Sequence, residues 1–488
     1  MAVDTRHPEH KYFNDIWTMI DDFSQGEKQV KSKKINYLMK NPEWTDLEYL
    51  DYLIASPFTN FSSRSINALL GAMFLKDPQI KLPQSIEYLH KNSDGKNNGL
   101  LQLVRRMSVE AIKKGRSGLY VDFPKVVTTS GSTASIKDTE GLQANLALYD
   151  ARNIINWKED EEGLTMVVLE ETYACPDALL ADEFSTEMKV QYRVLKRVNG
   201  VFSVTVYRNK EAYDTFTPKD YYGKPLSYIP FFFNGSVNND AECDTPPVYE
   251  IVSKNKSHYQ LEAEIMRSIR LVGAPMLTIS MGEIQAEQFL ALNDLNTDDG
   301  TERTLKFGSS RGLILGTGGR AELIQAEANG MAQTKADNIL SEAIMLGARL
   351  VTKSAGRMTA EQVRIESSAE TGVITSIAKN IEDALTNALT AVQQMMSPTF
   401  EPMVIVMNTE FIATSPDAQV LMFASQMTDL GRIAPVDMFD ILKRSGLISS
   451  ERTFEEVNGE AEEYLNKLQK EAPKEVETNK DMNPMQMA

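Results

Sequence analysis

The longest helical patterns of apolar and polar residues lie in the second half of the chain, in residues 331–351 and 360–397. The spacing of their apolar positions predicts two amphipathic helices. At 1.5 Å per residue these helices would span roughly 30 Å and 55 Å. Only the short insert 352–359 separates them. Helices of this length are more typical of a ring assembly, a coiled coil or a channel wall than of a compact enzyme.

The N-terminal half predicts short helices followed by a strand-rich block. Helical spacing covers residues 9–40, 45–56, 61–76 and 100–114. Gly115 is placed to cap the last of these helices. An apolar period close to two predicts strands at residues 118–123, 146–149, 164–169, 190–198 and 201–208, and the apolar run 229–233 predicts a further, buried strand. Asn199-Gly200 stands between two alternating runs, which is a strong hairpin signal.

The remaining pattern alternates between the two types of element. Helices are expected at residues 248–272 and 283–295, and in two short pieces within 417–446 that meet at Gly431. Strands are expected at residues 276–281, 313–315, 321–325 and 404–411. The charged residues 451–488 predict a frayed helix and then a disordered end. Together these elements indicate an α+β fold that is predominantly helical.

The charge and composition of the chain limit the kinds of protein that it can be. The 488 residues carry a net charge of −17, whereas a protein that coats DNA would present a basic face. This charge still allows a protein that surrounds DNA without gripping it. No apolar run approaches the roughly 18 residues of a membrane helix, so we expect no membrane segment. The first residues lack the apolar core of a signal peptide, and we expect synthesis in the cytoplasm.

The sequence offers few residues that could form a catalytic, metal-binding or phosphate-binding site. Cys175 and Cys243 have no metal-binding spacing, and the four histidines are scattered. The glycine-rich residues 316–320 lack the Lys-Ser/Thr of a phosphate-binding loop, so a β-turn is the better interpretation. We therefore expect no catalytic residues, no metal site and no cofactor.

Four stretches together resemble the portal proteins of tailed bacteriophages, the head-to-tail connectors through which DNA enters and leaves the capsid. They are ALYDARNIINWKED within residues 146–160, RLVGAPMLTISMG at 270–282, SAGRMTAEQVRIESSAETGVITSIAKNIEDAL at 354–385 and DAQVLMFASQMTDLGRIAPVDMFDILKRSGLI at 417–448. The likeness covers most of residues 9–450. The chain departs from the family in its short tail after Ser450 and in its compact segment 283–325.

The resemblance implies a portal fold with wing, stem, clip and short crown regions. The wing would comprise residues 1–247, with a helical part at 1–125 and a β-rich part at 142–233. The implied later regions are a first stem helix at 248–275, a clip at 276–328, a second stem helix at 329–351, a tunnel loop at 352–359, a long wing helix with a return strand at 360–412, crown-type helices at 413–450 and an acidic, largely disordered tail at 451–488.

The resemblance also implies roles for individual residues. Neighbouring subunits would pack through Ile339, Ala343, Leu346, Gly347 and Leu350, while the channel would be lined by Lys335, Asp337, Glu342 and Arg349. The tunnel loop would bring Lys353, Ser354, Gly356 and Arg357 close to DNA. Two alternatives stay open at this stage: the stem helices could be a buried pair inside one globular domain, and the insert a plain loop whose cations are solvated.

The partners that the resemblance implies are those of a capsid vertex. Copies of the chain would form a ring, usually of twelve subunits, around double-stranded DNA that passes without sequence-specific contacts. The other partners would be the large subunit of the terminase, the major capsid protein, a head–tail adaptor and a scaffolding protein, with the ring located in the virion. Such a protein is not an enzyme. The alternatives are another head–tail ring component, such as a collar or adaptor, and an enzyme with a helical substrate domain.

Overall fold

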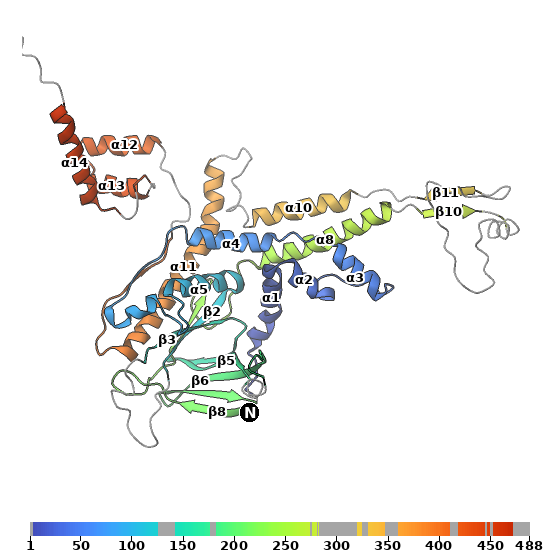
Figure 1. Ribbon diagram of the computed structural model, residues 1–488, viewed down its shortest axis with the longest axis horizontal. Coiled ribbons are helices and arrows are strands. Elements are labelled where there is room, and N and C mark those ends of the chain that lie inside the picture. Colours follow the sequence, from blue (N-terminus) through green and yellow to red (C-terminus); the bar gives the residue numbers. More distant parts are fainter. Residues whose placement is uncertain are drawn as a thin grey trace, which may run out of the picture. The chain divides into compact units, whose positions relative to one another are not determined.

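The protein has an α+β fold in the computed structural model (Figure 1). The structure describes residues 3–124, 142–175, 182–273, 276–280, 282, 320–324, 330–346, 360–409, 418–444, 447–448 and 452–471. Two units are distinguished by their internal contacts, Met1–Thr409 and Glu410–Ala488.

The chain begins with a group of helices: α1 (Pro8–Gln25), α2 (Glu27–Ser32), α3 (Asp46–Ala55) and α4 (Phe61–Met73). The helical pattern predicted over residues 9–40 is therefore interrupted. Gly26 stands between α1 and α2 with a φ of 94°, a conformation that favours glycine. Helix α3 starts with a capping box in which the side chains of Thr45 and Glu48 satisfy each other's backbone N–H groups.

Helix α5 (Leu100–Lys114) ends at Gly115, whose φ of 69° gives the left-handed cap that the sequence predicts. The next residues form β2 (Arg116–Asp122), the central strand of the order β3-β2-β9. Its neighbours are β3 (Asn145–Asp150) and β9 (Phe231–Gly235), both antiparallel to it. The buried strand predicted over residues 229–233 is confirmed by β9.

A second sheet is an antiparallel meander of the described strands β4 (Ile154–Asp160), β5 (Gly163–Ala174), β6 (Met188–Val198), β7 (Val201–Arg208) and β8 (Glu211–Phe216). Asn199 and Gly200 join β6 to β7 with φ values of 51° and 70°, which confirms the predicted hairpin and fits a type I′ turn. The sequence pattern did not predict β4 or β8. Register shifts interrupt the pairing of β4 with β5, and β8 is an exposed edge strand.

Two helices and two strands follow: α8 (Tyr249–Gly273), β10 (Met276–Ser280), β11 (Arg320–Ile324) and α10 (Met331–Met345). Strands β10 and β11 pair antiparallel. Helices α8 and α10 lie side by side (Figure 1). The helix predicted over residues 248–272 is confirmed, as is the strand predicted at 276–281. The elements predicted at 283–295 and 313–315 lie outside the described residues.

Helix α11 (Ala360–Met396) is the long helix that the sequence predicts. It packs against α4, α5, β2 and β9 through buried residues that include Ile377, Ile381, Leu385 and Leu389. Beyond it, β12 (Val404–Val406) pairs with β1 (Gln79–Lys81). This strand is shorter than the predicted 404–411, since its partner offers only the residues Gln79, Ile80 and Lys81 for pairing.

The second unit contains α12 (Ala418–Asp429), α13 (Pro435–Arg444) and α14 (Phe454–Glu471). Gly431 follows α12 with a φ of 68° and separates the two short helices as predicted. Helix α14 occupies the first part of the charged C-terminal region. The remainder of that region, from residue 472, lies outside the described residues.

Candidate functional site

The helix pair α8–α10 contains the described stem candidates. The side chain of Lys254 on α8 lies 2.5 Å from the Glu342 carboxylate on α10. Ile251 on α8 and Ala343 on α10 share an apolar cluster with Phe61 of α4. Higher residue numbers on α8 therefore lie beside lower residue numbers on α10: Ile251 is grouped with Ala343, and Lys254 contacts Glu342. The two helices are antiparallel.

On another side, helix α8 is hydrogen-bonded to the N-terminal helical region. Asn255 is fully buried, and its Oδ1 accepts hydrogen bonds from the backbone N–H and the hydroxyl of Ser62, at 3.2 and 2.8 Å. Its Nδ2 donates to the carbonyl oxygen of Thr59 at 2.8 Å. A buried amide whose donors and acceptors are satisfied fixes the position of the two helices it joins. The start of α8 is therefore held against α4 by polar as well as apolar contacts.

The apolar face of α10 packs within the chain itself. Ile339 is 5% exposed and Ala343 is 1% exposed, with α4 and α8 covering Ala343. Both side chains are thus buried within a single copy of the chain, and their assignment to contacts between subunits stays a prediction. Leu346, at the end of α10, is 38% exposed. Gly347 and Leu350, which we placed on the same face, lie outside the described residues.

The opposite face of α10 is polar and solvent-exposed. It presents Gln333, Thr334, Lys335, Asp337, Asn338 and Ser341. Two of the predicted channel-lining residues, Lys335 and Asp337, are thus on an open surface. Glu342 lies beside this face, and its hydrogen bond and charge contact with Lys254 lower its pKa. Arg349 and the tunnel-loop residues Lys353, Ser354, Gly356 and Arg357 lie outside the described residues.

His258 is buried where α8, α10 and α4 approach one another. Its ring meets that of Phe61 edge to face, and its Nε2 lies 3.6 Å from Glu262. Burial lowers the pKa of this histidine, while the nearby charges of Glu262 and Asp337 oppose the effect. The imidazole is therefore neutral at pH 7 and packs as an apolar ring.

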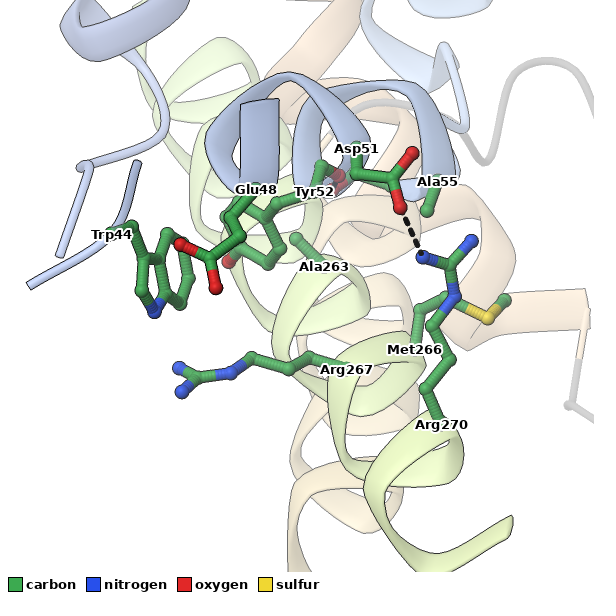
Figure 2. A pocket seen from close by; sticks show the side chains of 10 residues that line it. Trp44, Glu48, Asp51, Tyr52, Ala55, Ala263, Met266, Arg267 and Arg270 are labelled. Atoms are coloured by element: carbon green, nitrogen blue, oxygen red, sulfur yellow. Dashed lines mark hydrogen bonds and ion pairs between the residues drawn. The ribbon is translucent and has the colours of Figure 1, made fainter. Parts of the chain in front are cut away.

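A pocket of about 280 Å³ lies between α3 and α8 (Figure 2). Arg267 approaches the ring of Trp44, with 4.5 Å between the guanidinium carbon and the ring centroid, and Arg270 lies 3.9 Å from Asp51. Tyr52, which also lines the pocket, donates a hydrogen bond of 2.7 Å to Glu264. Sequence reasoning missed this pocket, because α3 and α8 are about two hundred positions apart in the chain.

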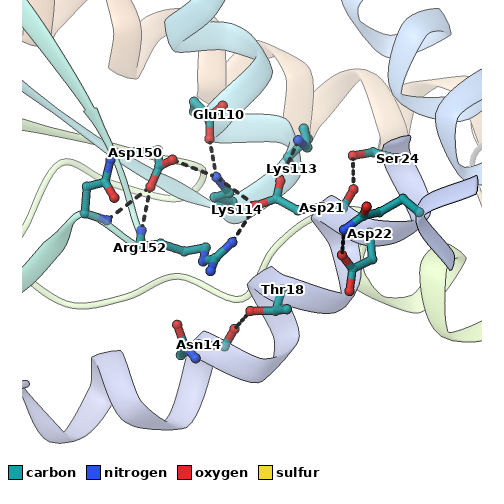
Figure 3. A network of polar contacts seen from close by, with 12 residues as sticks. Asn14, Thr18, Asp21, Asp22, Ser24, Glu110, Lys113, Lys114, Asp150 and Arg152 are labelled. Atoms are coloured by element: carbon teal, nitrogen blue, oxygen red, sulfur yellow. Dashed lines mark hydrogen bonds and ion pairs between the residues drawn. The ribbon is translucent and has the colours of Figure 1, made fainter. Parts of the chain in front are cut away.

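A buried ion-pair network joins α5, α1 and β3 (Figure 3). The Lys114 side chain is 2% exposed, and its Nζ lies 3.0 Å from Glu110, 3.2 Å from Asp21 and 3.2 Å from Asp150. Burial alone would lower the pKa of Lys114, but the three carboxylates together raise it. The network fixes helices and sheet relative to each other, and its charges are compensated.

The part of the chain that the structure describes contains no group of three or more His, Cys, Asp or Glu residues that could hold a metal ion. Within the same residues, no helix combines the length and apolar character needed to cross a bilayer.

A family model described as a domain of unknown function, DUF4055, matches residues 247–396, which include α8, α10 and α11. No curated protein sequence matches the chain. A solved chain titled "Virion of native gene transfer agent (GTA) particle" is 9% identical, with a TM-score of 0.39 over 84% of this chain and 98% of that one. A chain titled "Neck of empty GTA particle computed with C6 symmetry" is 11% identical, with a TM-score of 0.40 over 82% and 95% of the two chains. Likenesses at this level carry no argument about function.

Proposed function

We propose that this chain is a portal protein, one copy of a ring-shaped channel at a capsid vertex through which phage DNA is packaged and ejected. The observation that supports this most is the antiparallel pair α8–α10. One face of α10 is buried by α8 and α4, and the other presents a row of exposed polar side chains. A helix of this kind suits a wall that separates packed protein from a water-filled tunnel.

The exposed face of α10 also suits a conduit for DNA. It mixes Lys335 and Asp337 with uncharged polar residues, so it offers few cations to phosphate groups. Tight binding needs many Lys and Arg contacts to phosphates, each of which releases counterions. A wall of mixed charge and an acidic chain favour passage over binding. Sequence-independent passage is what packaging and ejection require.

Within this proposal, residues 248–275 and 329–351 are the stem, 276–328 the clip and 352–359 the tunnel loop. The ring would have about twelve copies, by the resemblance of the sequence to its family. The partners would be the terminase large subunit, the major capsid protein, a head–tail adaptor and, during assembly, a scaffolding protein. The chemical work of packaging would come from the terminase, and the ring itself would need no cofactor.

The DNA-facing role is tested by replacing Lys353 and Arg357 together with Ala in phage that carry the variant gene. We expect the particles to assemble but to contain a different amount of nuclease-protected DNA, because two cations per subunit leave the tunnel loop. A control variant, Lys196→Ala with Lys224→Ala, removes the same two charges from exposed positions in the strand-rich region. Equal DNA content and retention in all three phages would contradict the assignment of the loop.

A further inference from the structure

The pocket between α3 and α8 lies at the same level along α8 as the first turn of α10. Lys254 contacts Glu342, and the charge of Asp337 acts on His258 four residues further along α8. Both helices rise by about 1.5 Å per residue, so six further residues bring α8 to Glu264 and α10 back to Met331. Ala263 and Met266, which flank that level, line the pocket.

Helices α3 and α10 contact different flanks of α8. Ile251 and His258 face α10 and α4, whereas Ala263 and Arg270 line the pocket beside α3. Ile251 and Ala263 are twelve residues apart along α8, as are His258 and Arg270. At 3.6 residues per turn, twelve residues make three full turns plus roughly 120°. One flank of α8 therefore carries α10, and another carries the pocket.

A closed ring restricts which surfaces can meet. Rotation about the ring axis leaves the height of every atom along that axis unchanged. If α8 runs along the axis, as it would in the stem we propose, contacting surfaces of neighbouring copies must lie at equal heights and on different flanks. Met331 and the α3–α8 pocket satisfy both conditions.

The chemistry of the two surfaces is complementary. The Met331 side chain is 77% exposed, and the pocket walls include Tyr52, Ala55 and Met266. An unbranched thioether adapts to an irregular cavity and makes favourable contacts with aromatic rings.

The outer face of α3 is also apolar. Leu47, Leu50 and Ile54 recur at helical spacing and are 75%, 47% and 66% exposed. An apolar stripe on a surface helix is typical of a face that another protein covers. We propose, on the basis of the ring function above, that Met331 of each copy inserts into the α3–α8 pocket of the next copy. This contact is heterologous, so it generates a ring when the rotation closes.

The contact is tested by cross-linking the full-length protein that carries Ala55→Cys and Met331→Cys. A short bifunctional maleimide is expected to give a ladder of covalent oligomers on a denaturing gel. The control pairs Met331→Cys with Tyr213→Cys, because Tyr213 is 64% exposed on strand β8. The wild type, the single variants and the control all keep Cys175, which is buried, and Cys243, which is half-buried. None of them should give this ladder.

A second variant, Met331→Asp, separates the contact from the fold. It places a charge on an exposed position, so the circular dichroism spectrum should match that of the wild type. The concentration needed for ring assembly should rise by about tenfold or more, because a buried methionine contact is lost. The proposed contact is wrong if Met331→Asp forms rings normally and the double-cysteine protein gives no ladder. That result would leave the portal proposal unaffected. A wild-type protein that forms no rings overturns both.

Discussion

Among the residues that the structure describes, Lys114 is the only cation within 4 Å of Glu110 and Asp150. Replacing Lys114 with Met removes this cation. The ammonium group lies between these two carboxylates and Asp21, with its side chain 2% exposed. Methionine has a similar length but no charge, so it keeps much of the packing volume. The variant therefore isolates the electrostatic role of Lys114.

The magnitude follows from the burial of the site. Removing one partner of a buried ion pair leaves an uncompensated charge and costs about 3–5 kcal/mol. Asp21 keeps Lys113 at 2.7 Å and Arg152 at 3.5 Å, so the penalty falls on Glu110 and Asp150. We expect the free energy of unfolding to fall by about 3 kcal/mol at pH 7.

Urea unfolding followed by tryptophan fluorescence measures this change. Trp17 is a suitable reporter, because it is fully buried and its Nε1 donates a hydrogen bond of 2.9 Å to the carbonyl oxygen of Lys114. Lys113→Met is the matched control, since it carries the same substitution on the neighbouring residue and leaves Asp21 paired with Lys114. We expect it to lower the free energy of unfolding by less than Lys114→Met does, because Asp21 keeps Lys114 at 3.2 Å and Arg152 at 3.5 Å. Equal stability of the two variants would refute the role of Lys114 as the centre of the network.

The difference between wild type and Lys114→Met should also depend on pH. Burial works to raise the pKa of Asp21, but Lys114 and Lys113 outweigh it and lower the pKa below its ordinary value. The stability that Asp21 contributes is therefore present above the ordinary pKa and is lost as the pH falls through the lowered one. The gap between the two proteins should shrink on acidification. A gap that widens below pH 4 would contradict this reasoning.

Three further changes test the packing. Ala343→Leu should destabilise the chain by about 1–3 kcal/mol, because the added atoms meet Phe61 and Ile251 in a filled cluster, while Ser341→Leu on the polar face should not. Gly115→Ala should cost about 1–2 kcal/mol, since φ is +69° and the new Cβ would lie 2.8 Å from a carbonyl oxygen. Gly372→Ala, which meets nothing within 4 Å, should instead stabilise by about 0.5–1 kcal/mol. Urea midpoints measure all of them, and the reverse order of the two glycine variants would contradict the backbone argument.

The elements that were predicted well depend on local signals. Helix α5 and its cap at Gly115, and the hairpin at Asn199-Gly200, follow from the spacing of apolar residues and from turn chemistry within a few positions. The region 9–40 was predicted as continuous, because its apolar spacing does not reveal the conformation of Gly26. Strand β12 was predicted too long, because its length depends on β1, more than three hundred positions earlier in the chain.

In the candidate site, too, the features set by neighbouring residues were predicted and those set by distant residues were missed. The periodicity of α10 identified the apolar face that contains Ile339 and Ala343, and the structure buries both. Which partner covers this face depends on α4, far away in the sequence, and local spacing could not reveal it. Lys114 looks like a solvated lysine in the last turn of a helix, because the network that buries it combines carboxylates from three elements.

Electron microscopy of the purified full-length protein tests the central claim most directly, namely that copies of the α8–α10 pair stand side by side around a channel. We expect rings with a central hole and, in side views, a wide flange on a narrower stalk. Single particles of one chain, at concentrations where the protein is otherwise folded and soluble, would contradict the account.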